Sequence, residues 1–143
     1  MRKPAIILGS ILVLFFNVVV TTAASSDQAA VGQATNAAGG WLKLVDNGDY
    51  KQSWQQASTI FRNAVTDDQW AHQVGAVRKP LGALVSRKLK SAQYATSLPG
   101  APDGKYVVIQ YDSSFQNKSS AVETVTPMLD KDGQWRVSGY YIK

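Results

Sequence analysis

A change of periodicity at Gly82 divides this chain and limits the folds that it can adopt. Before Gly82, apolar residues recur at helical spacing, whereas the residues after it fall into short segments rich in β-branched and aromatic side chains. The first pattern is typical of amphipathic helices and the second of strands with one buried face. Because the helical part precedes the strand part without alternation, the sequence predicts an α+β fold.

Three helices are expected before Gly82. The first covers residues 33–45, where Ala34, Ala38, Trp41, Leu42 and Val45 form an apolar stripe, and it ends at Gly48. The second is short and begins at Asp49, with Tyr50, Trp54 and Ala57 on one side.

The third helix begins at a capping box formed by Thr66 and Gln69. Its buried face is expected to hold Trp70, Val74, Val77 and Leu81. Because proline lacks a backbone donor, Pro80 should kink or end this helix near Lys79.

Four strands are expected after Gly82, over residues 85–97, 106–115, 121–129 and 134–142. Gly133 follows three polar residues in a hairpin signal. The three helices are expected to pack on one face of a curved, four-stranded antiparallel sheet, in a single domain over residues 34–143.

The N-terminus reads as an export signal over residues 1–24. Arg2 and Lys3 precede an apolar run at 5–20, and small residues allow cleavage after Ala23 or Ala24, leaving a flexible lead at 25–33. The alternative is an uncleaved membrane anchor. A helix that spans a bilayer needs about 20 apolar residues, and the apolar run at 5–20 is shorter than this. We therefore expect a periplasmic or secreted protein without a stable membrane span after cleavage. The chain has no cysteine, which excludes lipoprotein processing and disulfides.

Charge gives little indication of a partner. The chain has 15 basic and 10 acidic residues, and the basic ones are scattered apart from Arg87, Lys88 and Lys90. This distribution argues against nucleic-acid binding. The three clustered charges would suit an anionic surface of the cell envelope or the protection of an exposed strand edge.

Sequence motifs from residue 34 to the C-terminus resemble those of one family. They are Trp41-Leu42, Leu44-Val45-Asp46, Gly48-Asp49-Tyr50, Ser53-Trp54, Arg78-Lys79-Pro80-Leu81-Gly82, Ser86-Arg87, Leu98-Pro99-Gly100, Asp103-Gly104, Glu123-Thr124-Val125, Asp132-Gly133-Gln134-Trp135-Arg136-Val137 and Gly139-Tyr140. The set resembles the exported bacterial family catalogued as domain of unknown function 4019. The resemblance implies a nuclear-transport-factor-2-like or cystatin-like cone, and it supplies no catalytic residues.

Glu123 is the only glutamate and lies within the third expected strand, on the same face as Val125 and Leu129. A carboxylate buried there would serve as an acid or base, or as one half of an ion pair with Arg78 or Arg87. Either arginine would alternatively bind an anionic group. The structural ion pair is the favoured reading.

Other residues indicate little chemistry. His72, the only histidine, lies away from the apolar stripe of its helix, and the carboxylates are not spaced as metal ligands. We therefore expect no metal and no cofactor. Asp46 and Asp49 read as capping residues around Gly48. Among the aromatic residues, Trp54 and Tyr140 are candidates to face a ligand.

These observations favour a non-enzymatic module that binds a protein or small ligand of the cell envelope through a pocket or the open face of its sheet. The alternative is a small hydrolase- or isomerase-type enzyme that uses Glu123 inside the cone. An unpaired Glu123 in a pocket would favour the enzyme, and a paired Glu123 in a filled core would favour the module.

Overall fold

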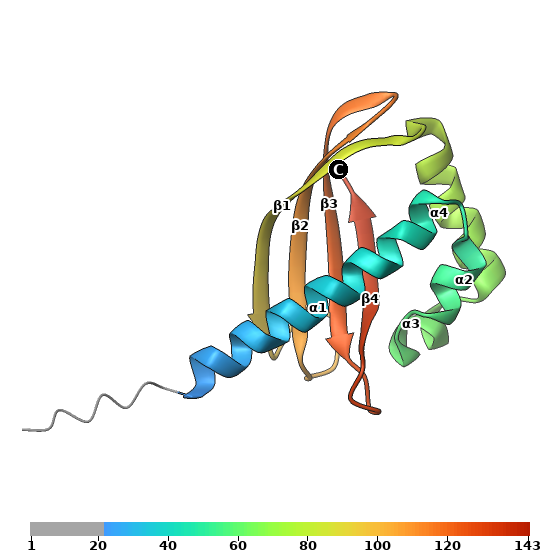
Figure 1. Cartoon of the computed structure of the whole chain (residues 1–143). Helices are drawn as coiled ribbons and strands as arrows, with labels where there is room; N and C mark the ends of the chain where they lie inside the picture. Colours follow the sequence, from blue (N-terminus) through green and yellow to red (C-terminus); the bar gives the residue numbers. More distant parts are fainter. Residues whose placement is uncertain (1–21) are drawn as a thin grey trace, which may run out of the picture.

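The computed structural model describes residues 22–143, which form four helices followed by a four-stranded antiparallel sheet (Figure 1). The helices are α1 (Thr22–Asp46), α2 (Tyr50–Gln55), α3 (Thr59–Ala64) and α4 (Asp67–Leu81). The strands are β1 (Leu84–Ala95), β2 (Tyr106–Phe115), β3 (Lys118–Leu129) and β4 (Trp135–Ile142). The predicted α+β fold is confirmed, and Gly82, at a φ of 73°, stands between the helices and the strands.

The prediction of three helices is wrong, because α3 was not expected. Its six residues are too few to show helical periodicity, and three hydrogen bonds to two polar side chains stabilise its start instead. The Ser58 hydroxyl accepts a hydrogen bond from the backbone N–H of Phe61. Asp130, at the end of β3, accepts hydrogen bonds from the backbone N–H and the hydroxyl of Thr59, at 2.9 and 3.0 Å. A contact across 71 positions thus stabilises this helix.

Helix α1 starts earlier than predicted. Residues 25–33, expected to be a flexible lead, are helical, and Val31 packs against the core. The predicted cleavage sites after Ala23 and Ala24 fall in the first turn of α1. The rest of the expected export signal, residues 1–21, lies outside the described residues. None of the helices described between residues 22 and 143 is long and apolar enough to cross a membrane.

The sheet is a meander in which the strands lie side by side in chain order. The pairing of β1 with β2 shifts register between Leu84 and Ser86 and again between Leu89 and Ser91. Such irregularities bend a strand and increase its twist. Figure 1 shows α1 crossing one face of the sheet diagonally, with α2, α3 and α4 beside β4.

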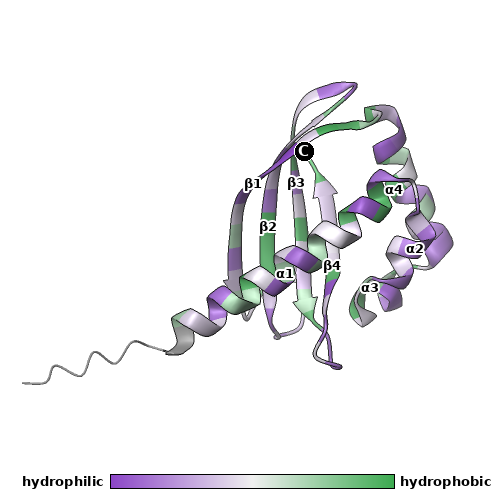
Figure 2. Ribbon diagram, in the orientation of Figure 1, coloured by the Kyte–Doolittle hydropathy of each residue, from purple (hydrophilic) through white to green (hydrophobic). Residues whose placement is uncertain are grey.

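The core lies between α1 and the sheet. All five members of the predicted α1 stripe are buried: Ala34, Ala38, Trp41, Leu42 and Val45. They belong to one cluster with sheet residues that include Val107, Ile109, Val125 and Val137, and hydrophobic segments alternate with polar ones along these elements in Figure 2. Burial of one large aliphatic side chain such as Leu42 contributes about 1.5–3 kcal/mol. The contact between α1 and the sheet therefore supplies much of the stability.

Helix α4 has the predicted beginning, since the capping box of Thr66 and Gln69 is present. Its end differs from the prediction, because the helix continues through Pro80 to Leu81. Proline at position 80 still removes a backbone donor, and Gly82 follows immediately as the C-cap.

The buried face of α4 also differs from the prediction. Val77 was expected to be buried, but its exposure is 48%, whereas that of Arg78 is 5%. Arg78 follows Val74 by four residues, so it lies on the same face as Val74 and reaches Asp46 at the end of α1. Arg78 therefore takes the inward position that the apolar pattern assigned to Val77, and it forms an ion pair with α1 there.

Candidate functional site

Glu123 lies in the middle of β3, and its exposure is 0%. Arg87 of β1 donates to it from Nε at 2.7 Å and from Nη2 at 3.1 Å. The hydroxyls of Ser113 and Tyr140 donate to the same carboxylate, one to each oxygen. Four donors fill the acceptor capacity of a carboxylate. The side chain is therefore paired in a filled core.

Arg87 joins Glu123 to a second carboxylate, that of Asp46 at the last position of α1. Its Nη1 and Nη2 atoms lie 2.8 and 2.9 Å from the two oxygens of Asp46. The planar guanidinium group thus makes a two-point contact with each carboxylate, the geometry that arginine provides and lysine does not. Arg87 fixes the end of α1 to the sheet.

Arg78 completes this group from α4. Its Nη2 atom donates to Asp46 at 2.8 Å, and its Nη1 atom lies 3.4 Å from the hydroxyl of Tyr140. The guanidinium carbon is 4.8 Å from the centre of the Phe115 ring, a cation–π arrangement. The charges of Asp46, Glu123 and the two arginines balance, and we call these four residues the ion cluster.

Three of the five predicted site residues, Glu123, Arg78 and Arg87, belong to the ion cluster. A fourth, Tyr140, contacts it through its hydroxyl. Arg87 is the direct partner of Glu123, whereas Arg78 pairs with Asp46. The role of Asp46 was missed, since it was read as a capping residue. A negative charge in the last turn of a helix faces an unfavourable dipole, which indicates that such a residue has a cationic partner.

The electrostatics of the cluster favour fixed charges. Burial alone would raise the pKa of Asp46, but the hydrogen bonds and charges of Arg87 and Arg78 hold that pKa below its ordinary value. Burial opposes the charge on Arg87, yet its bonds to Asp46 and Glu123 raise its pKa above the ordinary value. Burial and the charge of Glu123 raise the pKa of the Tyr140 hydroxyl. These three groups therefore keep their protonation states at neutral pH.

Five hollows of about 220–460 Å³ lie on the part of the chain that the structure describes, residues 22–143, and Glu123, Arg78 and Arg87 line none of these five. A hollow of about 220 Å³ between α4 and β4 is lined by Tyr140, whose hydroxyl contacts the ion cluster. Within the same residues, no group of three or more histidine, cysteine and acidic side chains is placed to hold a metal ion. In this arrangement the cluster joins α1, α4, β1 and β3.

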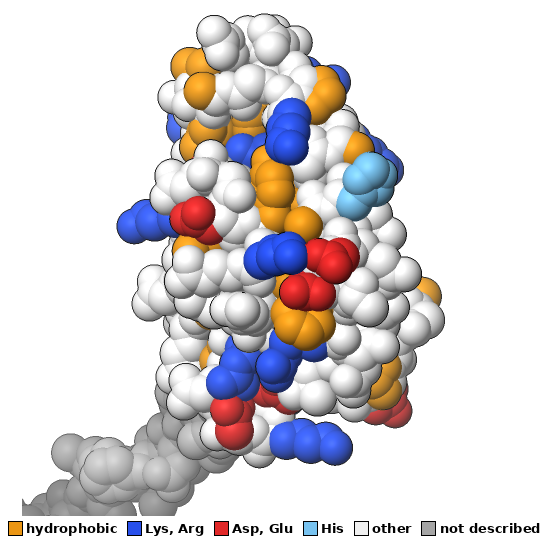
Figure 3. All heavy atoms as spheres, turned by 90° about the vertical axis from the view of Figure 1, so that its right-hand side faces the viewer, with side chains coloured by type: hydrophobic (Ala, Val, Ile, Leu, Met, Phe, Trp, Pro, Cys, Tyr) orange, Lys and Arg blue, Asp and Glu red, His pale blue; other side chains and the backbone are white. Residues whose placement is uncertain are grey.

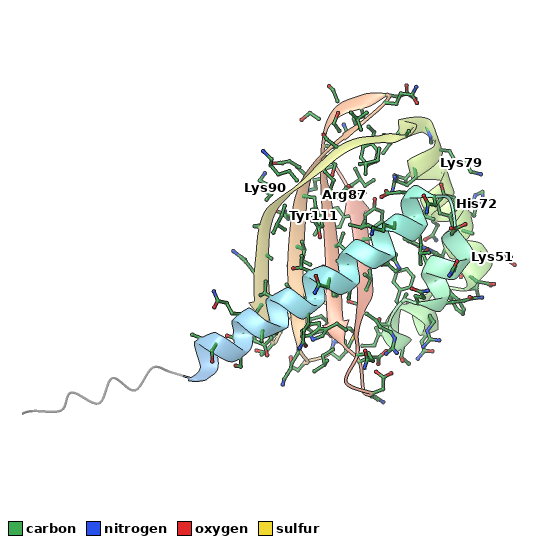
Figure 4. All side chains as sticks on the ribbon, in the orientation of Figure 1. Lys51, His72, Lys79, Arg87, Lys90 and Tyr111 are labelled. Atoms are coloured by element: carbon green, nitrogen blue, oxygen red, sulfur yellow. The ribbon has the colours of Figure 1, made fainter. Side chains whose placement is uncertain are left out.

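Trp54, the fifth predicted site residue, does not join the ion cluster. Its indole N–H donates to the backbone oxygen of Val65 at 2.7 Å, which ties α2 to the end of α3. Its ring packs against the hydrophobic core. His72 is exposed on α4, as predicted, and Figure 4 shows it on the outer side of the helices with Lys51 and Lys79.

The three basic residues on β1 do not form one surface. Arg87 points inward to the ion cluster, while Lys88 and Lys90 are exposed, and Lys90 lies 3.8 Å from Asp112 (Figure 4). The suggestion that Arg87 contacts an anionic surface is therefore wrong. On the helical side of the molecule, basic and acidic side chains are interspersed, as Figure 3 shows.

A different feature of the surface is a groove between α1, the end of α2 and β4. Its largest hollow measures about 460 Å³ and contains four amide side chains: Asn36, Gln55, Gln56 and Gln134. Two further hollows, of about 360 and 340 Å³, continue it along α1. Trp135 lines all three. We call these three hollows together the amide groove.

The amides of the largest hollow are available to a ligand. Within residues 22–143, none of the four side-chain amides makes a hydrogen bond. Gly40 also lines this hollow, and a Cβ added there would meet no heavy atom within 4 Å. A glycine inside a helix costs about 1 kcal/mol relative to alanine, and packing within residues 22–143 does not require one at position 40.

The fold and these two sites define a class of protein: an α+β domain with a closed ion cluster and a polar surface groove. A family model described as protein of unknown function (DUF4019) matches residues 37–140, and the chain belongs to this family. The resemblance carried by the sequence motifs is thus confirmed. A comparison with curated proteins finds no match.

Proposed function

We propose that this protein is a non-enzymatic binding module and that the amide groove is its ligand-binding surface. The observation that carries the proposal is the set of four unpaired side-chain amides around a hollow of about 460 Å³. Ligand sites commonly have a volume of about 300–1,000 Å³ and a few polar groups that fix the orientation of the ligand. Each amide presents both a donor and an acceptor to such a ligand.

The ion cluster supports a non-enzymatic role. An acid or base in catalysis must come within hydrogen-bond reach of its substrate. Glu123 is completely buried, and Arg87, Ser113 and Tyr140 already occupy its oxygens. The alternative of a hydrolase or isomerase that uses Glu123 therefore gains no support from this geometry.

The proposal places the module in the periplasm or outside the cell. Its basis is the expected export signal at residues 1–24, in which Arg2 and Lys3 precede an apolar run and small residues follow it. Detection of a shortened chain in the periplasmic fraction or the medium would support export, and a full-length chain in the cytoplasm would contradict it. We also retain, as part of the proposal, the expected likeness to a nuclear-transport-factor-2-like or cystatin-like cone.

Two glycine variants test the groove directly. Gly40→Trp places an indole in the largest hollow, whereas Gly32→Trp makes the same change on α1 outside the three hollows. An added Cβ meets no atom within 4 Å at either position. Tryptophan is a better helix former than glycine, so both variants are expected to fold.

The measurement is thermal unfolding of the exported protein with cell-envelope metabolites, glycans and peptides. A ligand at a hundredfold excess over its dissociation constant adds about 2.7 kcal/mol to the free energy of unfolding. We expect the shift to persist in Gly32→Trp and to vanish in Gly40→Trp. A ligand whose shift is unchanged in Gly40→Trp would show that the binding surface lies elsewhere.

A further inference from the structure

From the chemistry of the amide groove, we infer that its ligand is a neutral glycan, an uncharged chain rich in hydroxyl groups. This inference rests on the proposed function and adds the class of ligand. It depends on the shape of the groove, its charge, the Trp135 ring at the junction of the hollows, and the hydrogen bonding of the neighbouring strand edge.

The groove is elongated. Its three hollows adjoin, because the first two share Asn36 and Gln134, and the second and third share Gln33 and Gly133. Along α1 they extend from Ser26 to Trp41, which corresponds to about 22 Å at 1.5 Å per residue. A linear oligomer fits this shape better than a compact metabolite does.

The groove has little free charge. Arg136 is the one charged residue that lines the first two hollows, and Asp132 holds it through two contacts of 2.7 and 2.8 Å. The third hollow has Asp27 and Lys105, which carry opposite charges. In the first two hollows a strongly anionic or cationic ligand would lack a free counter-charge. Side-chain amides instead match hydroxyl groups, because both kinds of group donate and accept hydrogen bonds.

Trp135 gives the groove an apolar surface at the junction of its hollows. Its indole N–H donates to Gln33 of α1 at 3.1 Å, so the ring is held between β4 and α1. Since the ring lines all three hollows, it is placed to contact the C–H face of a sugar ring while the amides bind the hydroxyls. This combination of the fixed Trp135 ring and several amides suits a saccharide.

An extended peptide is the competing ligand, and the strand edge argues against it. Peptides commonly bind by pairing with a free strand edge or by placing apolar side chains in a groove. Where β4 borders the amide groove, the backbone oxygen of Val137 already accepts a hydrogen bond from the N–H of Ser58 at 2.9 Å. A peptide at this place could not pair with the strand edge at Val137 and would have only the side-chain amides as partners. A glycan does not use strand pairing, so the side-chain amides are sufficient for it.

The test is calorimetric titration of the exported protein with cellohexaose, maltohexaose and N-acetylchitohexaose. A set of uncharged, extended peptides serves as the competing class. We expect at least one hexasaccharide to bind, with an affinity that is the same at low and high salt because the ligand is neutral. Gly40→Trp should weaken this binding at least tenfold, and Gly32→Trp should leave it unchanged.

The outcomes separate the two claims. If the peptides bind, lose affinity in Gly40→Trp, and no hexasaccharide binds, the inference about the ligand is overturned and the proposed binding surface stands. If a hexasaccharide binds equally well to Gly40→Trp, both claims are overturned. If neither class binds, the neutral-glycan inference fails. The thermal-unfolding screen with cell-envelope metabolites, glycans and peptides, compared between the wild type and Gly40→Trp, then tests the proposed function.

Discussion

Arg87 and Asp46, 41 positions apart in the sequence, are joined by two hydrogen bonds of 2.8 and 2.9 Å between β1 and the end of α1. Because Arg87 also holds Glu123, one guanidinium group connects the helix to two strands of the sheet. This contact makes the ion cluster part of the scaffold that positions α1, and α1 in turn forms one wall of the amide groove.

Removal of the central arginine should be severely destabilising. Arg87→Leu leaves the carboxylates of Asp46 and Glu123 buried without their shared partner, and breaking one half of a buried pair costs about 3–5 kcal/mol. Urea unfolding measures the change. Lys90→Leu is the control, since Lys90 is exposed and its contact with Asp112 is 3.8 Å, so its effect should stay below about 1 kcal/mol. Equal effects of the two substitutions would contradict a structural role for the cluster.

Alkaline pH should destabilise the protein through Tyr140. Its pKa is raised in the folded state, so its contribution to stability is complete below the unfolded pKa of about 10 and is lost as pH rises above it. The free energy of unfolding of Tyr140→Phe should therefore fall less steeply above pH 10 than that of the wild type. Tyr141→Phe, at a residue that is 51% exposed, should keep the wild-type slope. A Tyr140→Phe curve parallel to the wild-type curve would count against this contribution.

Acid should act through Asp46 in the opposite direction. Its pKa is lowered in the folded state, so its contribution is complete above the unfolded pKa of about 3.9 and is lost as pH falls through the lower folded value. Asp46→Asn should therefore be less stable at neutral pH and should show a weaker dependence of stability on acid. Unfolding at a series of pH values below 5 measures the slope. An acid dependence as steep as that of the wild type would mean that other carboxylates account for it.

Two valines on α4 test which face of that helix is buried. Val74 is in the core, whereas Val77 is 48% exposed. Removing two methyl groups from the buried position should cost about 2 kcal/mol in Val74→Ala, while Val77→Ala should change stability by less than about 0.5 kcal/mol. Thermal or urea unfolding compares them. A larger loss of stability for Val77→Ala than for Val74→Ala would contradict the structure and would mean that Val77 lies on the buried face, as the apolar pattern predicts.

The difference between prediction and structure on α4 has a physical cause. The α1 stripe could be predicted from Ala34 to Val45 because one layer of apolar contacts determines it over several helical turns. On α4, the inward position goes to Arg78, because a carboxylate from another helix lies opposite it. The spacing of apolar residues indicates which side of a helix is apolar. It does not indicate that Asp46 of α1 lies opposite Arg78 in the folded protein.

Long-range contacts also explain why α3 and the amide groove could not be predicted from the sequence. Helix α3 depends on Asp130, which is far from it in the sequence. The amide groove combines residues from α1, the end of α2 and the β3–β4 hairpin, and in the sequence each of its glutamines and asparagines resembles an ordinary surface residue. Glu123 and its possible arginine partners, in contrast, were predictable, because a single glutamate in an apolar strand requires a counter-charge.

The most direct test of the amide groove as the binding surface is amide chemical-shift mapping by NMR, in which the purified protein is titrated with the hexasaccharide that binds most tightly. The account predicts that the perturbed signals belong to residues of the amide groove, including Gly40, Gln134 and Trp135. It also predicts that Glu123→Gln leaves the affinity unchanged at a temperature where that variant is folded. Perturbations centred on Glu123 and Arg87, with affinity lost in Glu123→Gln, would contradict the account and make the ion cluster the functional site.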